Sequence, residues 1–185
     1  LSDRPGQSHY RISVKRETEG EVSNFLHDRL EVGDELCLTA PSGNFVLNQQ
    51  QRPLVLLTGG VGITPAISML QPALESGRQV HFLHGALNSS THAFRAHVDA
   101  LAAQHDNLKV SYVYSDPLEG DQAHETGFFD QQKLSAMLPA STDVDVYFLG
   151  PKPFMQSCQK LLNELGIPAE NQRYEFFGPL ESLSA

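Results

Sequence analysis

The chain has 185 residues, a formal net charge of −9 and 40% hydrophobic residues, which suits one large domain or one domain with part of another. The acidic balance argues against nucleic-acid or membrane-surface binding, and the sequence shows neither an apolar run of about 18 residues nor a signal peptide. We therefore expect a cytoplasmic protein. Cys37 and Cys158 are expected to be reduced thiols, with one disulfide as the alternative. Because Leu1 is not a methionine, we expect a piece of a longer protein.

The first 50 residues predict short strands around one helix. Tyr10–Arg16 alternates apolar and polar residues, as a half-exposed strand does. Glu21–Arg29 predicts a short helix, and Glu35–Thr39 and Phe45–Leu47 predict two further strands. These few strands cannot close a sheet alone, so we expect their edges to need partners from elsewhere.

From Leu54 onward, strands and helices alternate. The expected strands are the run from Leu54, Gln79–Ala86, Leu108–Tyr114, Asp145–Leu149 and Gln172–Glu175. The expected helices are Pro65–Ser76, His92–Gln104, Asp130–Leu138 and Phe154–Leu165. This alternation predicts an α/β fold with a five-stranded parallel sheet and helices on both faces, and a ligand at the carboxyl ends of the strands.

A glycine-rich loop follows the first of these strands, at Gly59–Gly62. Thr64 is expected to cap the next helix, with Pro65 at its first position. A strand, a bare loop and a helix N-terminus together bind phosphate. The pattern Gly-x-Gly-x-x-Pro departs from the usual dinucleotide fingerprint and lacks the Lys-Ser/Thr of a P-loop. The alternative is a turn that binds nothing.

Two further strand ends bear on the ligand. A ribose-binding acid would normally follow the strand that ends near Ala86, but none is present, and Arg95 is the one candidate contact for a 2′-phosphate. This favours NADH over NADPH. The strand ending at Leu149 breaks at Gly150-Pro151, which predicts a second bare loop for the far end of a dinucleotide, or an ordinary turn.

The histidines do not predict a metal site. His81 and His84 are three apart in a strand and point to opposite faces, and His92 and His97 do not share a helix face. Solvated or locally bonded histidines are the favoured interpretation, and no catalytic Ser/His/Asp or Cys/His set stands out. After the last strand, Tyr174–Pro179 carries aromatic residues and a carboxylate. They predict either a buried anchor or an aromatic ring closing over a planar cofactor.

The chain resembles the reductase part of flavohaemoglobins, within the ferredoxin-reductase-like superfamily. The matching segments cover nearly the whole chain. They are Tyr10–Glu17 with Val22–Asn24, Gly33-Asp34 with Ala40–Gly43, Gly59–Pro65, His92–Phe94, Gly150–Met155 and Tyr174–Pro179. The glycine loop is shared across the superfamily, whereas the His-Ala-Phe segment and the C-terminal segment point to flavohaemoglobins more narrowly.

This resemblance implies two domains. Residues 1–50 would be the C-terminal part of a truncated antiparallel β-barrel that binds FAD, and residues 51–185 an NAD(P)H-binding domain with a tail that contacts the flavin. The residues implied for the nicotinamide nucleotide are Gly60, Val61, Gly62, Ile63, Thr64, Pro65, Gly150 and Pro151. Those implied for FAD are Val22 and Ser23 at its pyrophosphate and Phe176, Phe177, Gly178 and Pro179 along the flavin, with Phe177 stacked near the ring and Glu175 tuning its potential.

In the full-length protein, the resemblance implies hydride transfer from NAD(P)H to FAD and single-electron transfer to haem b in a globin domain, where nitric oxide and O₂ become nitrate. The globin domain is missing here, and the family's Arg-x-Tyr-Ser flavin motif would end before Leu1. Leu149 stands where relatives usually have a cysteine beside the nicotinamide. The alternatives are another flavin-dependent NAD(P)H reductase of the superfamily, or a dinucleotide-binding module without catalysis.

Overall fold

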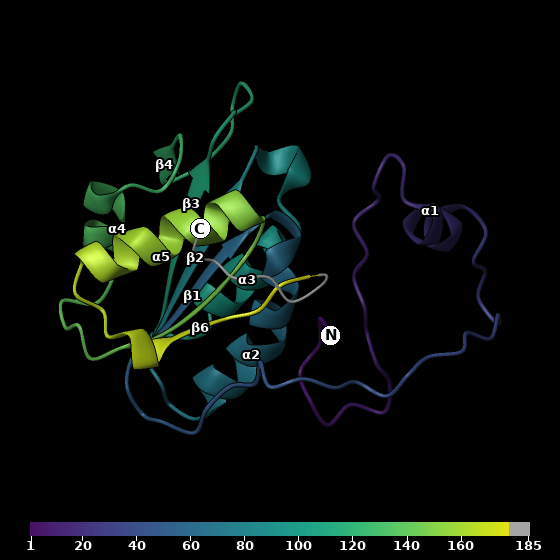
Figure 1. The fold of residues 1–185 in the computed structure, drawn as a ribbon, viewed down its shortest axis with the longest axis horizontal. Helices are drawn as coiled ribbons and strands as arrows, with labels where there is room; N and C mark the ends of the chain where they lie inside the picture. The colour runs from purple at the N-terminus through teal and green to yellow at the C-terminus, as the bar shows by residue number, and fades with distance from the viewer. Residues whose placement is uncertain (178–185) are drawn as a thin grey trace.

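The computed structural model describes residues 1–177 and shows an α/β unit from which an N-terminal arm, residues 1–53, extends to one side (Figure 1). Six parallel strands form the sheet, in the order β4-β3-β2-β1-β5-β6. The strands are β1 (Leu54–Gly59), β2 (Val80–Ala86), β3 (Leu108–Tyr114), β4 (Glu125–Thr126), β5 (Asp145–Leu149) and β6 (Gln172–Tyr174).

The prediction of five strands was wrong by one. Strand β4 pairs with the end of β3 through only two residue pairs, Val113 with Glu125 and Tyr114 with Thr126. Both residues of β4 are polar and exposed. The strand therefore depends on backbone pairing with its neighbour and leaves no apolar pattern in the sequence.

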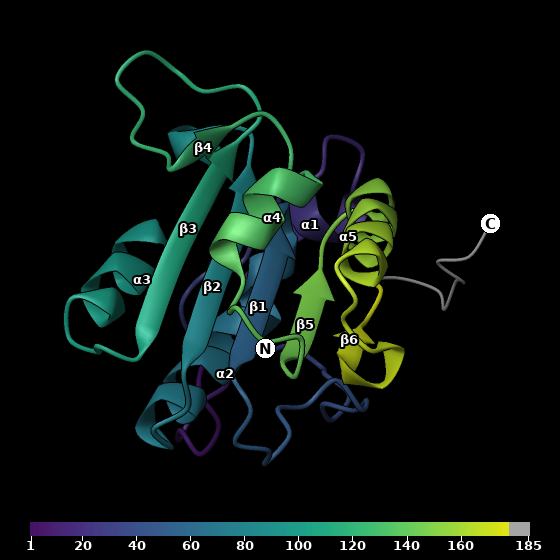
Figure 2. The same ribbon diagram turned by 90° about the vertical axis from the view of Figure 1, so that its left-hand side faces the viewer.

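The predicted helices on both faces are confirmed. Leu54 and Leu56 of β1 pack in one core with α2 (Ile63–Glu75) and α3 (Arg95–Ala102). Val55 and Leu57 pack in a second core with α4 (Gln131–Met137) and α5 (Lys152–Glu164), and α4 lies in front of the strands in Figure 2. The unbroken apolar run of β1 follows from this burial on both sides.

Three helices begin two or more residues from their predicted starts, and for α5 the start is Lys152 rather than Phe154. Helix α2 starts at Ile63 with Gly62 as N-cap, so the prediction of Thr64 as the cap was wrong. Helix α3 starts at Arg95 because Phe94 has a φ of 61°, a left-handed conformation that a helix cannot include. The preceding turn is a short 3-10 helix, Ser89–Thr91.

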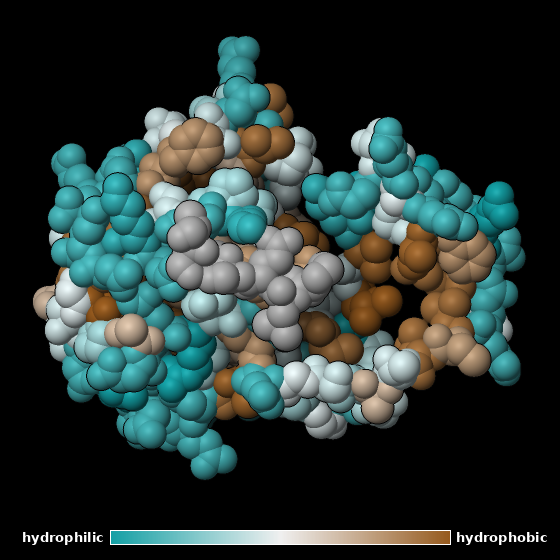
Figure 3. Space-filling view, in the orientation of Figure 1, coloured by the Kyte–Doolittle hydropathy of each residue, from teal (hydrophilic) through white to brown (hydrophobic). Residues whose placement is uncertain are grey.

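The barrel strands predicted for the arm are not formed. Within residues 1–53 the helix α1 (Glu21–Asp28) is the one regular element, and Tyr10–Arg16, Glu35–Thr39 and Phe45–Leu47 are irregular. A strand needs a partner for its backbone groups, and the arm supplies none for these segments. Figure 3 shows apolar surface on the side of the arm that faces the α/β unit. The exposed apolar residues of the arm include Tyr10, Ile12, Val22, Phe25, Val32, Leu36 and Leu38.

Candidate nucleotide-binding site

Three strand ends meet at the carboxyl edge of the sheet, as the sequence predicts. Gly59 is paired with Gly85 across β1 and β2, and Thr58 is paired with Leu149 across β1 and β5. The glycine loop forms a 3-10 turn, Gly60–Gly62, and continues directly into α2. The loop and the start of this helix therefore sit where parallel sheets bind their ligands.

The glycines of this loop serve different purposes. A Cβ at Gly62 would lie 2.2 Å from the carbonyl oxygen of Leu149, so glycine is required there for α2 to pack against the end of β5. Gly60 is exposed, has a φ of 53°, and an added Cβ would meet no atom within 4 Å. The open side of the loop is thus at Gly60, and backbone there is accessible to a ligand.

The start of α2 has no side-chain cap, because its N-cap is Gly62. The Ile63 N–H is bonded within the 3-10 turn, to the carbonyls of Gly60 and Val61, so the turn and α2 form one continuous helical segment whose N-terminus, at Gly60, is the positive end of the dipole. Together with the open backbone at Gly60, this edge can accept the phosphates of a nucleotide.

The ring of Phe154 covers the neighbouring strand ends. An added Cβ would lie 2.6 Å from this ring at Gly150, 3.0 Å from it at Gly59 and 3.7 Å from it at Gly85. Gly59 and Gly150 thus leave room for one aromatic side chain from α5, whereas at Gly85 the nearer ring is that of Phe129, at 3.2 Å. Gly150 and Pro151 lie beside the glycine loop, and their contact with a nucleotide stays a prediction.

Two buried histidines lie beneath this edge, on the α2/α3 side of the sheet. His84 contacts Thr58 (Nδ1 to Oγ1, 2.8 Å), and because the Thr58 hydroxyl donates to the Leu83 carbonyl, the imidazole donates to Thr58. His92 contacts the Tyr114 hydroxyl through Nδ1 (2.8 Å), and its ring centroid is 4.5 Å from that of His84. Neither Nε2 atom has a hydrogen-bond partner.

Burial is the main cause that lowers the pKa values of these histidines, to about 3 for His84 and about 4 for His92. For His92 the nearby guanidinium of Arg95 acts in the same direction. Both rings are therefore neutral near pH 7. The expectation of locally bonded histidines holds for this pair, whereas the contact between the two rings was not predicted.

The C-terminal tail connects the sheet to the arm. Tyr174 packs against Phe148 and Phe176, with ring centroids 5.2 and 5.9 Å apart, and Phe176 also contacts the α4/α5 core. Phe177 is 58% exposed. The Glu175 carboxylate lies beside Gly43 of the arm, 3.3 Å from the place of an added Cβ. The tail thus brings together two segments far apart in the sequence. Gly178 and Pro179 lie outside the described residues.

The residues predicted for the FAD pyrophosphate are not near the glycine loop. Val22 is exposed on α1, which lies apart from the sheet in Figure 1. Ser23 donates to the Gly20 carbonyl and accepts from the backbone N–H of Glu17, so its hydroxyl fixes the start of α1.

Arg95, the candidate for a 2′-phosphate, is held by the protein itself. It donates to the Tyr114 hydroxyl (3.1 Å) and to the Gln122 carbonyl (2.7 Å). Its Nε also lies 3.6 Å from the Asp99 carboxylate.

Residues 1–177 contain no group of three or more His, Cys, Asp or Glu side chains placed to hold a metal ion. In the same part of the chain, no helix is both long and apolar enough to cross a membrane. Cys37 is exposed, Cys158 is buried, and both are free thiols.

The open glycine loop, the uncapped helix and the parallel sheet define an α/β nucleotide-binding domain of the dinucleotide-binding class. The oxidoreductase NAD-binding domain family matches residues 56–160. Flavohemoproteins from Burkholderia sp. (strain TH2) and Pseudomonas putida are 51% and 52% identical over 94% of this chain, which covers 44% of each relative. A solved structure, the flavohem-like FAD/NAD binding domain of nitric oxide dioxygenase from Vibrio cholerae, has a TM-score of 0.87 and 34% identity over 97% of this chain and 76% of its own.

The chain therefore belongs to the oxidoreductase NAD-binding domain family, and within it to the reductase part of flavohemoproteins. It spans about half the length of the curated relatives that it matches.

Proposed function

We propose that this chain is the NAD(P)H:FAD reductase portion of a flavohaemoglobin, the protein that carries out nitric oxide dioxygenation. The observation that carries the proposal is the open backbone at Gly60, next to the uncapped N-terminus of α2 at the carboxyl edge of the sheet. The Vibrio cholerae domain of similar fold is titled as an FAD/NAD-binding domain of nitric oxide dioxygenase. Electrons would leave the chain for the haem of a globin domain in the same full-length cytoplasmic protein.

In this proposal the loop from Gly60 to Pro65 holds the nucleotide phosphates, and Gly150-Pro151 lies along its far end. Leu149, at the end of β5, is almost fully buried and keeps this region apolar. FAD, when bound, accepts a hydride from NAD(P)H and passes electrons on singly. The contribution of the protein is to bind both groups and align them.

The tail and the arm would hold the flavin. Phe177 is exposed beside Phe176 and offers a ring face for stacking, and Glu175 lies where the tail meets Gly43 of the arm. Residues 1–50, including Val22 and Ser23, belong to the FAD side in this proposal, with the domain boundary at residues 50 and 51. The arm has no sheet of its own, so barrel strands from the full-length protein would complete it.

We further propose NADH as the preferred donor. Arg95 is already bonded to Tyr114 and Gln122, so its guanidinium is not available to a 2′-phosphate without breaking those bonds. After β2, where a ribose-binding acid would normally follow, the Asn88 side chain caps the next turn and bonds to the Asp116 carbonyl, so it is also engaged within the protein.

An anaerobic visible spectrum tests the proposal. The chain is mixed with FAD, freed of unbound flavin and given NADH, and a retained flavin band that bleaches is the expected result. Phe177→Ala should slow the bleaching, whereas Phe128→Ala, at another exposed phenylalanine beside β4, should not. Saturable NADH binding without retained flavin would leave a nucleotide-binding domain whose flavin site depends on the barrel strands of the full-length protein, because the arm has no sheet of its own. The absence of both signals would refute the dinucleotide site.

A further inference from the structure

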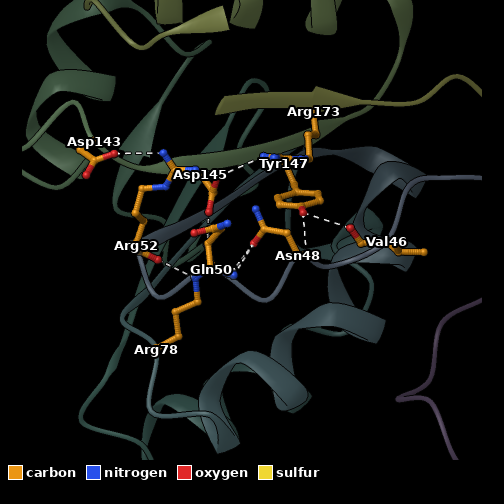
Figure 4. Close-up of polar contacts among 9 residues, drawn as sticks. All are labelled: Val46, Asn48, Gln50, Arg52, Arg78, Asp143, Asp145, Tyr147 and Arg173. Atoms are coloured by element: carbon orange, nitrogen blue, oxygen red, sulfur yellow. Dashed lines mark hydrogen bonds and ion pairs between the residues drawn. The ribbon is translucent and has the colours of Figure 1, made fainter. Parts of the chain in front are cut away.

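A cluster of charged side chains lies at the edge of the sheet opposite the glycine loop (Figure 4). Its centre is Asp145, the fully buried first residue of β5. The Asp145 carboxylate accepts hydrogen bonds from Arg78, from Arg173 (3.0 Å) and from Arg52 (3.3 Å). A carboxylate in this position is tolerated only because several cations and hydrogen bonds compensate for its lost hydration.

The same cluster holds the last part of the arm, residues 46–52, which leads into β1 and is called the joining segment below. Arg78 is also buried, and it donates to the Arg52 carbonyl (2.6 Å) and to the Asn48 side chain (3.0 Å). The Tyr147 hydroxyl donates to the Val46 carbonyl (3.0 Å) and accepts from the Asn48 backbone N–H (2.9 Å). Four hydrogen bonds from two side chains of the sheet unit therefore fix this joining segment.

The joining segment leads directly to the part of the arm that meets the tail. Phe45 packs edge-on against the Tyr147 ring, with centroids 5.5 Å apart. Two residues earlier, Gly43 lies beside the Glu175 carboxylate. The placement of the arm against the tail thus depends on how the joining segment is held at the base of the sheet.

We propose that Arg78, Asp145 and Tyr147 form a positioning cluster that fixes the arm relative to the nucleotide edge and so aligns the flavin side with the nicotinamide side for hydride transfer. None of these residues touches the reacting groups; they act through the joining segment. The inference rests on the proposed function for its catalytic consequence, but the placement of the arm can be tested without it.

The first test measures the placement directly. One nitroxide label is attached to the native Cys37 of the arm and another to Ala136→Cys, an exposed position on α4, since Cys158 is buried and will not react. Tyr147→Phe removes only the hydroxyl that holds the joining segment. Tyr112→Phe is the matched control, because this buried tyrosine bonds to Asp99 and not to the joining segment.

In double electron–electron resonance, we expect Tyr147→Phe to broaden the distribution of distances between the two labels. Tyr112→Phe should leave this distribution as it is in the labelled chain with both tyrosines intact. Adding Asn48→Ala, which removes an acceptor of Arg78, should broaden it further. An unchanged distribution in both tyrosine variants, or equal broadening in both, would overturn the inference.

The second test uses the chain loaded with FAD. At saturating NADH, Tyr147→Phe should slow flavin reduction by about tenfold while the NADH concentration at half-saturation stays the same, because misalignment affects transfer more than binding. An unchanged rate, or a loss that is entirely weaker NADH binding, would contradict the positioning role. If the unsubstituted chain retains FAD but NADH does not reduce it, the proposed function fails, and the label distances still decide whether the cluster holds the arm.

Discussion

Acid should destabilise this chain through the histidine pair beneath the nucleotide edge. His84 and His92 are buried and neutral, with folded-state pKa values of about 3 and about 4 against 6.5 for an exposed histidine. Below pH 6.5 the two histidines bind protons in the unfolded chain, whereas in the folded chain they stay neutral until the pH approaches about 4. The free energy of unfolding therefore falls as the pH drops from about 6.5 toward about 4, and it is independent of these two groups above about pH 7.

The magnitude follows from the two pKa values of each group. At about pH 5 the linkage relation gives a loss of about 2 kcal/mol for each histidine, or about 4 kcal/mol for the pair. This is a large fraction of the stability of an ordinary domain. His81 contributes in the same direction, because burial lowers its pKa as well, despite its contact with the Met137 carbonyl.

Urea unfolding at about pH 7.5 and about pH 5 measures the effect. In His92→Asn the loss of stability between the two pH values should be smaller than in the unsubstituted chain by about 2 kcal/mol. His97→Asn, at an exposed histidine on α3 outside the buried pair, is the matched control substitution. If His92→Asn keeps the full pH dependence, the burial argument for this pair is refuted.

Three further outcomes follow from the structure. Gly62→Ala should lower the free energy of unfolding by more than about 3 kcal/mol, because its Cβ overlaps a backbone carbonyl of β5. Gly60→Ala should lower it by only about 1 kcal/mol and should chiefly weaken NADH binding. Urea unfolding and NADH titration measure the two effects. Phe154→Ala should cost about 3 kcal/mol in urea unfolding by uncovering the strand ends at Gly59 and Gly150. A thiol reagent should modify only Cys37 in the folded chain, since Cys158 is buried and burial raises its pKa; complete modification before unfolding would contradict the buried position.

The α/β unit was predictable because each of its main elements carries its own signal. The run from Leu54 is buried on both faces, and Gly77 and Gly166 end their helices with positive φ values of 78° and 75°. The arm was not predictable in the same way. Alternation in Tyr10–Arg16 describes which face would be buried in a sheet, but a strand forms only when another strand pairs with it.

In the candidate site, too, the local features could be predicted from the sequence and the contacts between distant residues could not. The glycine loop lies in one continuous segment, so its geometry follows from local sequence. The ring contact between His84 and His92 and the packing of Phe154 against Gly59 involve residues that are not neighbours in the sequence. The bonds of Asp145 in β5 to three arginines likewise depend on how the segments before β1 and β2 come together with β6. No spacing pattern in the sequence predicts such contacts, although glycines near several strand ends indicate that another part of the chain packs closely there.

The uncovered arm also determines how the isolated chain should behave during purification. Val32 and Leu38 are exposed on irregular backbone, and such segments can add to the same segment of another molecule. A concentrated solution is thus expected to self-associate through residues 1–53 while the α/β unit stays native. Trypsin should cut at exposed sites such as Lys15 and Arg29, but residues 30–51 contain no Lys or Arg and Arg52 precedes Pro53, so the product keeps Val32 and Leu38 and should still self-associate.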